Sequence, residues 1–118
     1  MPWFERSFHF DFPVGLFPII FSRLEGSIFR LSVITQSATE EKLTYNVTGW
    51  SVKEHVGHLS DLEELWWNRL NDFQQKKAIL TAADLTNSKT KKGGHNDKAL
   101  ELLLSQFALE RQKILETI

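Results

Sequence analysis

Two histidines and a carboxylate fall within one segment, residues 50–73, whose pattern is otherwise that of an amphipathic helix. His55 and His58 are three residues apart, so both imidazoles can lie on one side of a helix. Their spacing is not the His-x-x-x-His spacing of many helical metal sites, and two imidazoles leave a divalent ion one or two ligands short. Nothing in the spacing of His9 and His95 ties them to this pair. Taken alone, the pattern favours hydrogen-bonded or solvent-edge histidines over metal ligands.

Glu63 lies on the apolar side of the same helix. With about 100° per residue, it falls near the middle of the face formed by Val52, Val56, Leu59, Leu62, Trp66, Leu70 and Phe73. A carboxylate buried without a partner costs several kcal/mol or takes up a proton. Arg111 likewise interrupts the apolar stripe of a later helix. Two interpretations follow: a Glu63–Arg111 pair that holds two helices in register, or a polar pocket at the centre of a bundle.

Three long helices position these residues. The best-defined start is at Ser51, where Ser51 and Glu54 have the spacing of a capping box and Trp50 stands where a hydrophobic staple would. This helix is expected to run to about Gln75. A first helix is expected over residues 14–36, and a third from Asn96 or Asp97 to the last residue, with polar connections at 37–49 and 84–97.

Before the first helix, aromatic and polar residues alternate over residues 3–12. No second strand pattern follows that could pair with this segment. We therefore expect an extended arm whose rings pack on the helical body, namely Trp3, Phe4, Phe8, Phe10 and Phe12.

Composition limits the classes of function. The chain has 118 residues, 42% of them hydrophobic, which is enough for a single domain with one core. The formal net charge is -1, so no overall field draws the chain to nucleic acid or to an anionic membrane. There is no cysteine, which excludes disulfides, thiolate catalysis and zinc–sulfur sites. The first residues do not resemble a secretion signal, and no apolar run is long enough to span a bilayer, so a cytoplasmic protein is expected.

Several motifs together resemble the DinB-like (YfiT-like) superfamily. The most specific are Trp50-Ser51-Val52-Lys53-Glu54 and Gly57-His58-Leu59, which match the signature opening that family's second helix. The likeness continues over nearly the whole chain, in residues 3–6, 61–69, 83–87 and 95–111. The resemblance implies a four-helix bundle, often dimeric, with a divalent metal such as nickel or zinc on three histidines. It implies metal-dependent hydrolase or thiol-transferase chemistry.

By this resemblance His58 is a metal ligand, His55 is its neighbour, and Glu63 contributes to the surrounding site. The family's other two ligands come from a His-x-x-x-His motif in the last helix, and no such motif follows His58 here. We therefore expect an all-α, up-down bundle of three of the four helices, with residues 1–118 forming one domain truncated at its C-terminus. The metal site would be incomplete and no metal would be held tightly. The alternative is a non-catalytic helical module that self-associates, as a dimer, to hide its apolar faces.

Overall fold

A computed structural model describes residues 2, 5–9, 11–47 and 49–118, and within these residues the only regular structure is helical. The all-α class is therefore confirmed. The elements in chain order are η2 (Val14–Leu16), α1 (Phe17–Thr35), α2 (Glu40–Thr44), α3 (Val52–Gln74), α4 (Ser88–Lys92), η3 (His95–Asp97) and α5 (Leu100–Thr117). Three long helices form close to the expected bounds, and short helices occupy the two segments expected to be polar connections.

The start of α3 follows the expected local chemistry. The Ser51 side chain accepts a hydrogen bond from the Glu54 N–H at 3.1 Å, and the Glu54 carboxylate accepts one from the Ser51 N–H at 3.1 Å. This reciprocal pair is the capping box. Asn46 and Asn96 donate to the same carboxylate oxygen at 3.2 and 3.1 Å, so the cap also holds two flanking segments. The Ser51 N–H is the main cause of a lowered Glu54 pKa.

The third long helix begins later than expected. Gly94 adopts φ 63°, which favours glycine, and Lys98 is extended at φ -98° and ψ 151°. The single turn of η3 lies between them, and α5 begins only at Leu100, after an N-cap residue, Ala99, whose side chain cannot cap. The expected start at Asn96 or Asp97 was therefore wrong by a few residues, because the chain turns there before it enters the helix.

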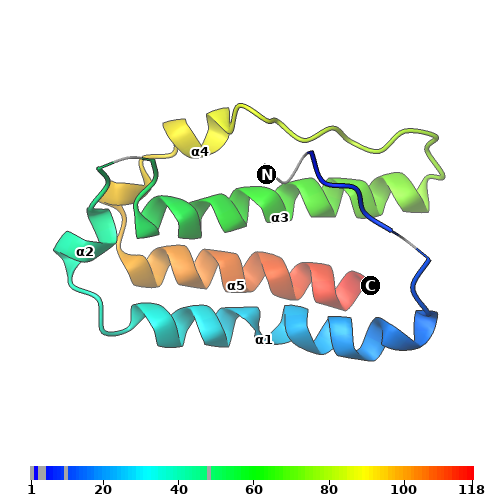
Figure 1. Ribbon diagram of the computed structural model, residues 1–118, viewed down its shortest axis with the longest axis horizontal. Coiled ribbons are helices and arrows are strands. Elements are labelled where there is room, and N and C mark those ends of the chain that lie inside the picture. Colours follow the sequence, from blue (N-terminus) through cyan, green and yellow to red (C-terminus); the bar gives the residue numbers. More distant parts are fainter. Residues whose placement is uncertain (1, 3–4, 10, 48) are drawn as a thin grey trace.

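The long helices do not simply alternate in direction. In Figure 1, α1 runs opposite to α3, but α3 and α5 both start at the end where α2 lies and run the same way. The chain returns between them through residues 75–99, a crossover that contains α4 and η3. Thr81 anchors this return: its N–H and hydroxyl donate to Asp72 at 2.6 Å, and its carbonyl accepts from Arg69 at 3.0 Å. Four-helix bundles with such long crossovers are known, but the expected up-down order is not what these three helices adopt.

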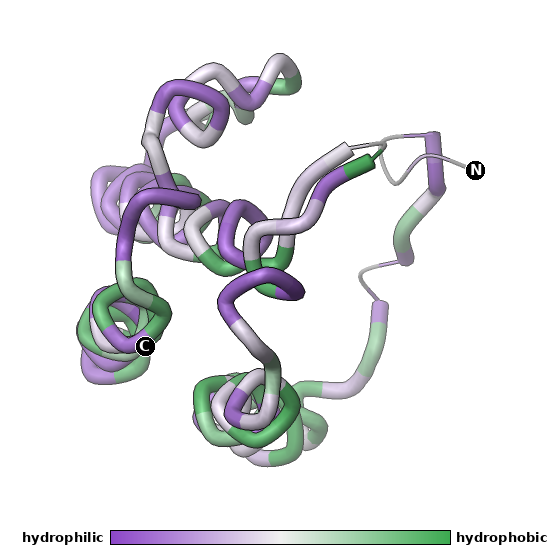
Figure 2. The backbone as a smooth tube through the Cα atoms, turned by 90° about the vertical axis from the view of Figure 1, so that its left-hand side faces the viewer, coloured by the Kyte–Doolittle hydropathy of each residue, from purple (hydrophilic) through white to green (hydrophobic). Residues whose placement is uncertain are grey.

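Of the three long helices, α5 occupies the corner. It packs against both α3 and α1, whereas among the described residues α1 and α3 have little direct contact (Figure 2). The main core cluster joins α2, the start of α3 and the start of α5 through Leu43, Val56, Leu100 and Leu103. This cluster lies at the end of the helices that adjoins α2, and Phe107 and Ile114 continue the buried surface along α5. The side of α1 and α3 that faces away from α5 is less covered.

The aromatic arm does not behave as expected. Trp3, Phe4 and Phe10 lie outside the described residues. Phe8 and Phe12, the two rings of the arm that the structure describes, are more than half exposed, so the helical body does not bury them as the sequence pattern suggested. Extended spacing alone did not determine where these rings lie, since that depends on an apolar surface that the helices must offer.

In the described part of the chain, no helix combines the length and the apolar character needed to cross a bilayer.

Candidate functional site

Glu63 is engaged by Arg111. The Glu63 side chain is 3% exposed, and its two oxygens accept from the Arg111 Nε and Nη2 at 2.8 and 2.6 Å. The third nitrogen, Nη1, donates to the Leu24 carbonyl at 3.0 Å, so one guanidinium joins α1, α3 and α5. Of the two interpretations of Glu63, the structure therefore agrees with the Glu63–Arg111 pair and not with an open polar pocket. Both carboxylate oxygens are used by a bidentate pair, which holds the helices in register.

His58 faces inward and takes part in a hydrogen-bonded chain. Its Nδ1 lies 3.0 Å from the Thr90 hydroxyl, which lies 2.6 Å from an Asp61 carboxylate oxygen. The carboxylate can only accept, so the Thr90 proton goes to Asp61, and Thr90 in turn accepts from the His58 Nδ1–H. In the neutral ring, Nε2 then carries the free lone pair. Burial is the main cause of a lowered His58 pKa, which favours that neutral ring.

Trp50 covers the two histidines of α3. Its ring centroid lies 4.7 Å from that of His58 and 5.4 Å from that of His55, both in edge-on geometry. His55 is exposed, whereas His58 is half-buried. The structure thus places His55 near His58, as the family resemblance implied, but His55 is exposed to solvent.

His95 joins this region, although its sequence spacing gave no reason to expect it. The imidazole is 7% exposed, and its Nε2 lies 3.6 Å from the same Asp61 oxygen that accepts from Thr90. The ring lies against Gly57 in α3, where an added Cβ would overlap it. Asp61, Thr90 and His95 are the site residues that sequence reasoning missed. The available signal was a glycine in the middle of α3 and the Gly93-Gly94 pair just before His95.

The residues present do not form the three-histidine set that the family resemblance implies. Within residues 5–9, 11–47 and 49–118, no three side chains of histidine, cysteine, aspartate or glutamate converge in a way that could hold a metal ion. His58 offers one nitrogen, but His55 lies toward solvent and His95 lies against Asp61. No step of metal chemistry can be derived from these side chains alone.

A second feature is an apolar face on the open side of α1 and α3, called the α1/α3 face below. Ile34 is 73% exposed on α1, and Phe73 is 65% exposed on α3. Helical periodicity places further apolar residues on the same sides of α1 and α3, some exposed and some half-buried: Ile20, Leu59, Leu62, Trp66 and Leu70. Ile34 and Phe73 lie at opposite ends of this face, because α1 and α3 run in opposite directions. Exposed apolar residues that follow one side of two neighbouring helices are typical of interaction sites in soluble proteins.

Comparison with known proteins gives no assignment. No family model, no curated protein and no solved structure matches this chain.

Proposed function

We propose that this chain is a helix-binding module. The α1/α3 face binds one amphipathic α-helix, which completes a four-helix bundle by filling the corner opposite α5. The observation that carries the proposal is the arrangement of three long helices at three corners, with the apolar sides of α1 and α3 uncovered. Long amphipathic helices are stable when such faces are covered by another element.

The charges around the α1/α3 face indicate the chemistry of the partner helix. By helical periodicity Arg23 and Arg30 border the face on α1, and Arg69 borders it on α3. Among the described residues, none of the three arginines forms an ion pair with an acidic side chain. Arg69 instead lies 5.1 Å from the centroid of the Trp66 ring. A helix with an apolar stripe bordered by glutamate or aspartate matches this pattern best.

Two synthetic peptides test this proposal. Both are amphipathic helices with leucine at the i, i+3, i+4 and i+7 positions. One has glutamate beside the leucines and the other has lysine. We expect the glutamate peptide to bind about tenfold or more tightly than the lysine peptide, and Arg23→Glu to reduce or reverse that preference.

Two matched substitutions locate the binding surface. Phe73→Ser removes a large apolar group from the α1/α3 face, and Leu109→Ser removes one of similar exposure, 70%, from the outer side of α5. Phe73→Ser should weaken peptide binding, and Leu109→Ser should leave it unchanged. Equal binding of both peptides, or equal effects of both variants, would refute the assignment. The alternative occupant is a second copy of this chain. Sedimentation of the chain alone tests it, because a stable homodimer that masks the face would mean that a second copy fills it.

The DinB-like resemblance supplies a second candidate function, a metal-dependent enzyme in which His58 is one ligand. The observation in its favour is the His58–Thr90–Asp61 chain, since metal-binding histidines commonly donate their other ring N–H to such a partner. Titration with nickel or zinc tests it, with His58→Ala as the variant and His55→Ala as its control. Absence of binding, or binding that His58→Ala leaves intact, would remove this candidate for the chain as described here.

A further inference from the structure

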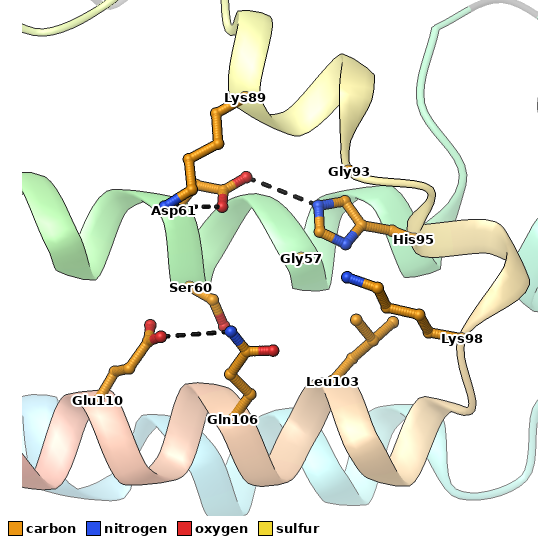
Figure 3. Close-up of a pocket in the computed structure, with 10 residues that line it drawn as sticks. All are labelled: Gly57, Ser60, Asp61, Lys89, Gly93, His95, Lys98, Leu103, Gln106 and Glu110. Carbon is orange, nitrogen blue, oxygen red and sulfur yellow. Dashed lines mark hydrogen bonds and ion pairs between the residues drawn. The ribbon is translucent and has the colours of Figure 1, made fainter.

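A small cavity lies between α3, α5 and the segment from α4 to η3 (Figure 3). By helical periodicity, its α3 residues lie on a different side of that helix from the α1/α3 face. Its volume is about 140 Å³, well below the roughly 300 Å³ at which pockets for drug-sized ligands begin. Ser60 and Leu103 form part of its wall, with His95, Lys98, Gln106 and Glu110 around them. A site of this size suits a molecule of only a few non-hydrogen atoms.

Two of the lining side chains carry buried polar atoms without partners. Within the described ranges, neither ring nitrogen of His95 has a hydrogen-bond partner, and the same holds for Oε2 of Glu110. Buried polar groups are nearly always satisfied, because each unpaired one costs on the order of 1–3 kcal/mol. His95 is only 7% exposed, and its Nε2 points to the Asp61 carboxylate, 3.6 Å away (Figure 3). Nδ1 faces the cavity beside Lys98, so a bound group is the natural partner for this nitrogen.

Four charged side chains line the cavity, namely Asp61, Lys89, Lys98 and Glu110. The Asp61 carboxylate is already engaged by the Thr90 hydroxyl and by Lys89, which leaves Lys98 and Glu110 as the charges without a charged partner among the described residues. In Figure 3 the Lys98 ammonium extends toward His95 at one end, and Glu110 lies at the other end beyond Gln106. Lys98 forms no ion pair with any acidic group that the structure describes, whereas Lys89 is already held by Glu64 and Asp61. The Gln106 side-chain amide donates to Oε1 of Glu110 at 3.4 Å, which leaves Oε2 available for another donor. One end therefore suits an anion and the other suits a hydrogen-bond donor or a cation.

We propose that this cavity binds a small amino acid, with its carboxylate at Lys98 and His95 and its ammonium group at Glu110. The lysine supplies a full charge and the imidazole supplies an N–H, the two donors that a carboxylate takes. The glutamate accepts from the ammonium. Burial is the main cause of a raised Glu110 pKa in the empty cavity, and an ammonium group beside it would favour the charged carboxylate.

Four probes at constant ionic strength test the proposal: glycine, β-alanine, acetate and ethylammonium. The readout is the shift of the His95 ring signals in NMR titrations of the full chain. Glycine or β-alanine should bind about tenfold or more tightly than acetate and ethylammonium, since only the amino acids engage both ends. Acetate binding as tightly as glycine would overturn the proposal in favour of a simple anion site. No ring shift with any probe at millimolar concentration would mean that the cavity holds water only.

Two variants assign the ends. Lys98→Met and Glu110→Gln keep the length of each side chain but remove its charge, and each should weaken amino acid binding about tenfold. Lys113→Met is the matched control, because Lys113 is also on α5 but its ammonium lies over the Trp67 ring, 3.8 Å from the centroid, and it does not line this cavity. Helical circular dichroism confirms that each variant folds. Wild-type affinity in both cavity variants would refute the assignment.

Discussion

Replacing Arg111 with methionine tests what the buried ion pair does. Arg111 is 13% exposed and Glu63 is 3% exposed, so the substitution leaves a carboxylate in an apolar site with no cation. Removing one partner of a buried pair costs about 3–5 kcal/mol, and the lost hydrogen bond to the Leu24 carbonyl adds about 1 kcal/mol. That total is a large part of the 5–15 kcal/mol typical of a domain. We expect Arg111→Met to be severely destabilised.

The double variant separates charge from packing. Glu63→Met combined with Arg111→Met removes both charges and fills the space with apolar side chains, which is often neutral or stabilising for buried pairs. Urea unfolding followed by circular dichroism measures the free energy of unfolding of the wild type, both single variants and the double variant. The double variant should recover most of the loss. Gln112→Met, an exposed neighbour on α5, serves as the control and should change stability little.

The reasoning would be refuted by a loss below about 1 kcal/mol in Arg111→Met, the level of an ordinary exposed pair. It would also be refuted if the double variant were as unstable as the single one, since packing would then explain the loss.

Three further predictions concern the start of α3 and the region around His58. Ser51→Ala removes the capping hydroxyl, so the free energy of unfolding measured in urea should fall by about 1 kcal/mol. The His58 pKa is lowered in the folded state, so the stability that the neutral ring contributes is complete above the unfolded pKa near 6.5 and is lost as the pH falls below that value. The free energy of unfolding, measured between pH 5 and 8, should therefore fall toward acid pH in the wild type, and this fall should be absent in His58→Gln. Gly57→Ala places a methyl group into the His95 ring, so it should lower the melting temperature and shift the His95 ring signals in NMR, and unchanged signals would show that the ring does not lie there.

Short-range chemistry was the part of this structure that could be read from the sequence. The Ser51–Glu54 capping box involves residues three apart and depends on little else, so its prediction was confirmed in detail. Helical periodicity placed Glu63 and Arg111 on the apolar faces of two helices. It therefore predicted the observed ion pair as one of two alternatives, the other being a polar pocket. The choice between an ion pair and a polar pocket depends on how α3 and α5 are rotated against each other, which no local sequence pattern determines.

The site residues that the sequence did not predict, Asp61, Thr90 and His95, all depend on contacts between residues that are far apart in the chain. Thr90 lies 32 residues from His58 in sequence, and the contact exists only because the crossover brings α4 back over α3. No periodic pattern encodes such a return, so there was no reason in the sequence to connect Asp61 with Thr90, or with His95 in the expected polar connection over residues 84–97. The short helix α2 was missed for a different reason. Its signal, a Thr39 cap followed by two glutamates, is present but covers only five helical residues.

The position of the main core cluster at one end of the helices has a consequence for where the molecule opens first. Leu43, Val56, Leu100 and Leu103 fasten the end of the helices that adjoins α2, while the opposite ends, around Phe17 and Phe73, contribute exposed rings. Segments with few buried contacts separate at a lower free energy than the rest. Fraying should therefore start at those distal tips and travel toward α2. Amide protons near Val56 and Leu103 should be the last to exchange with deuterium.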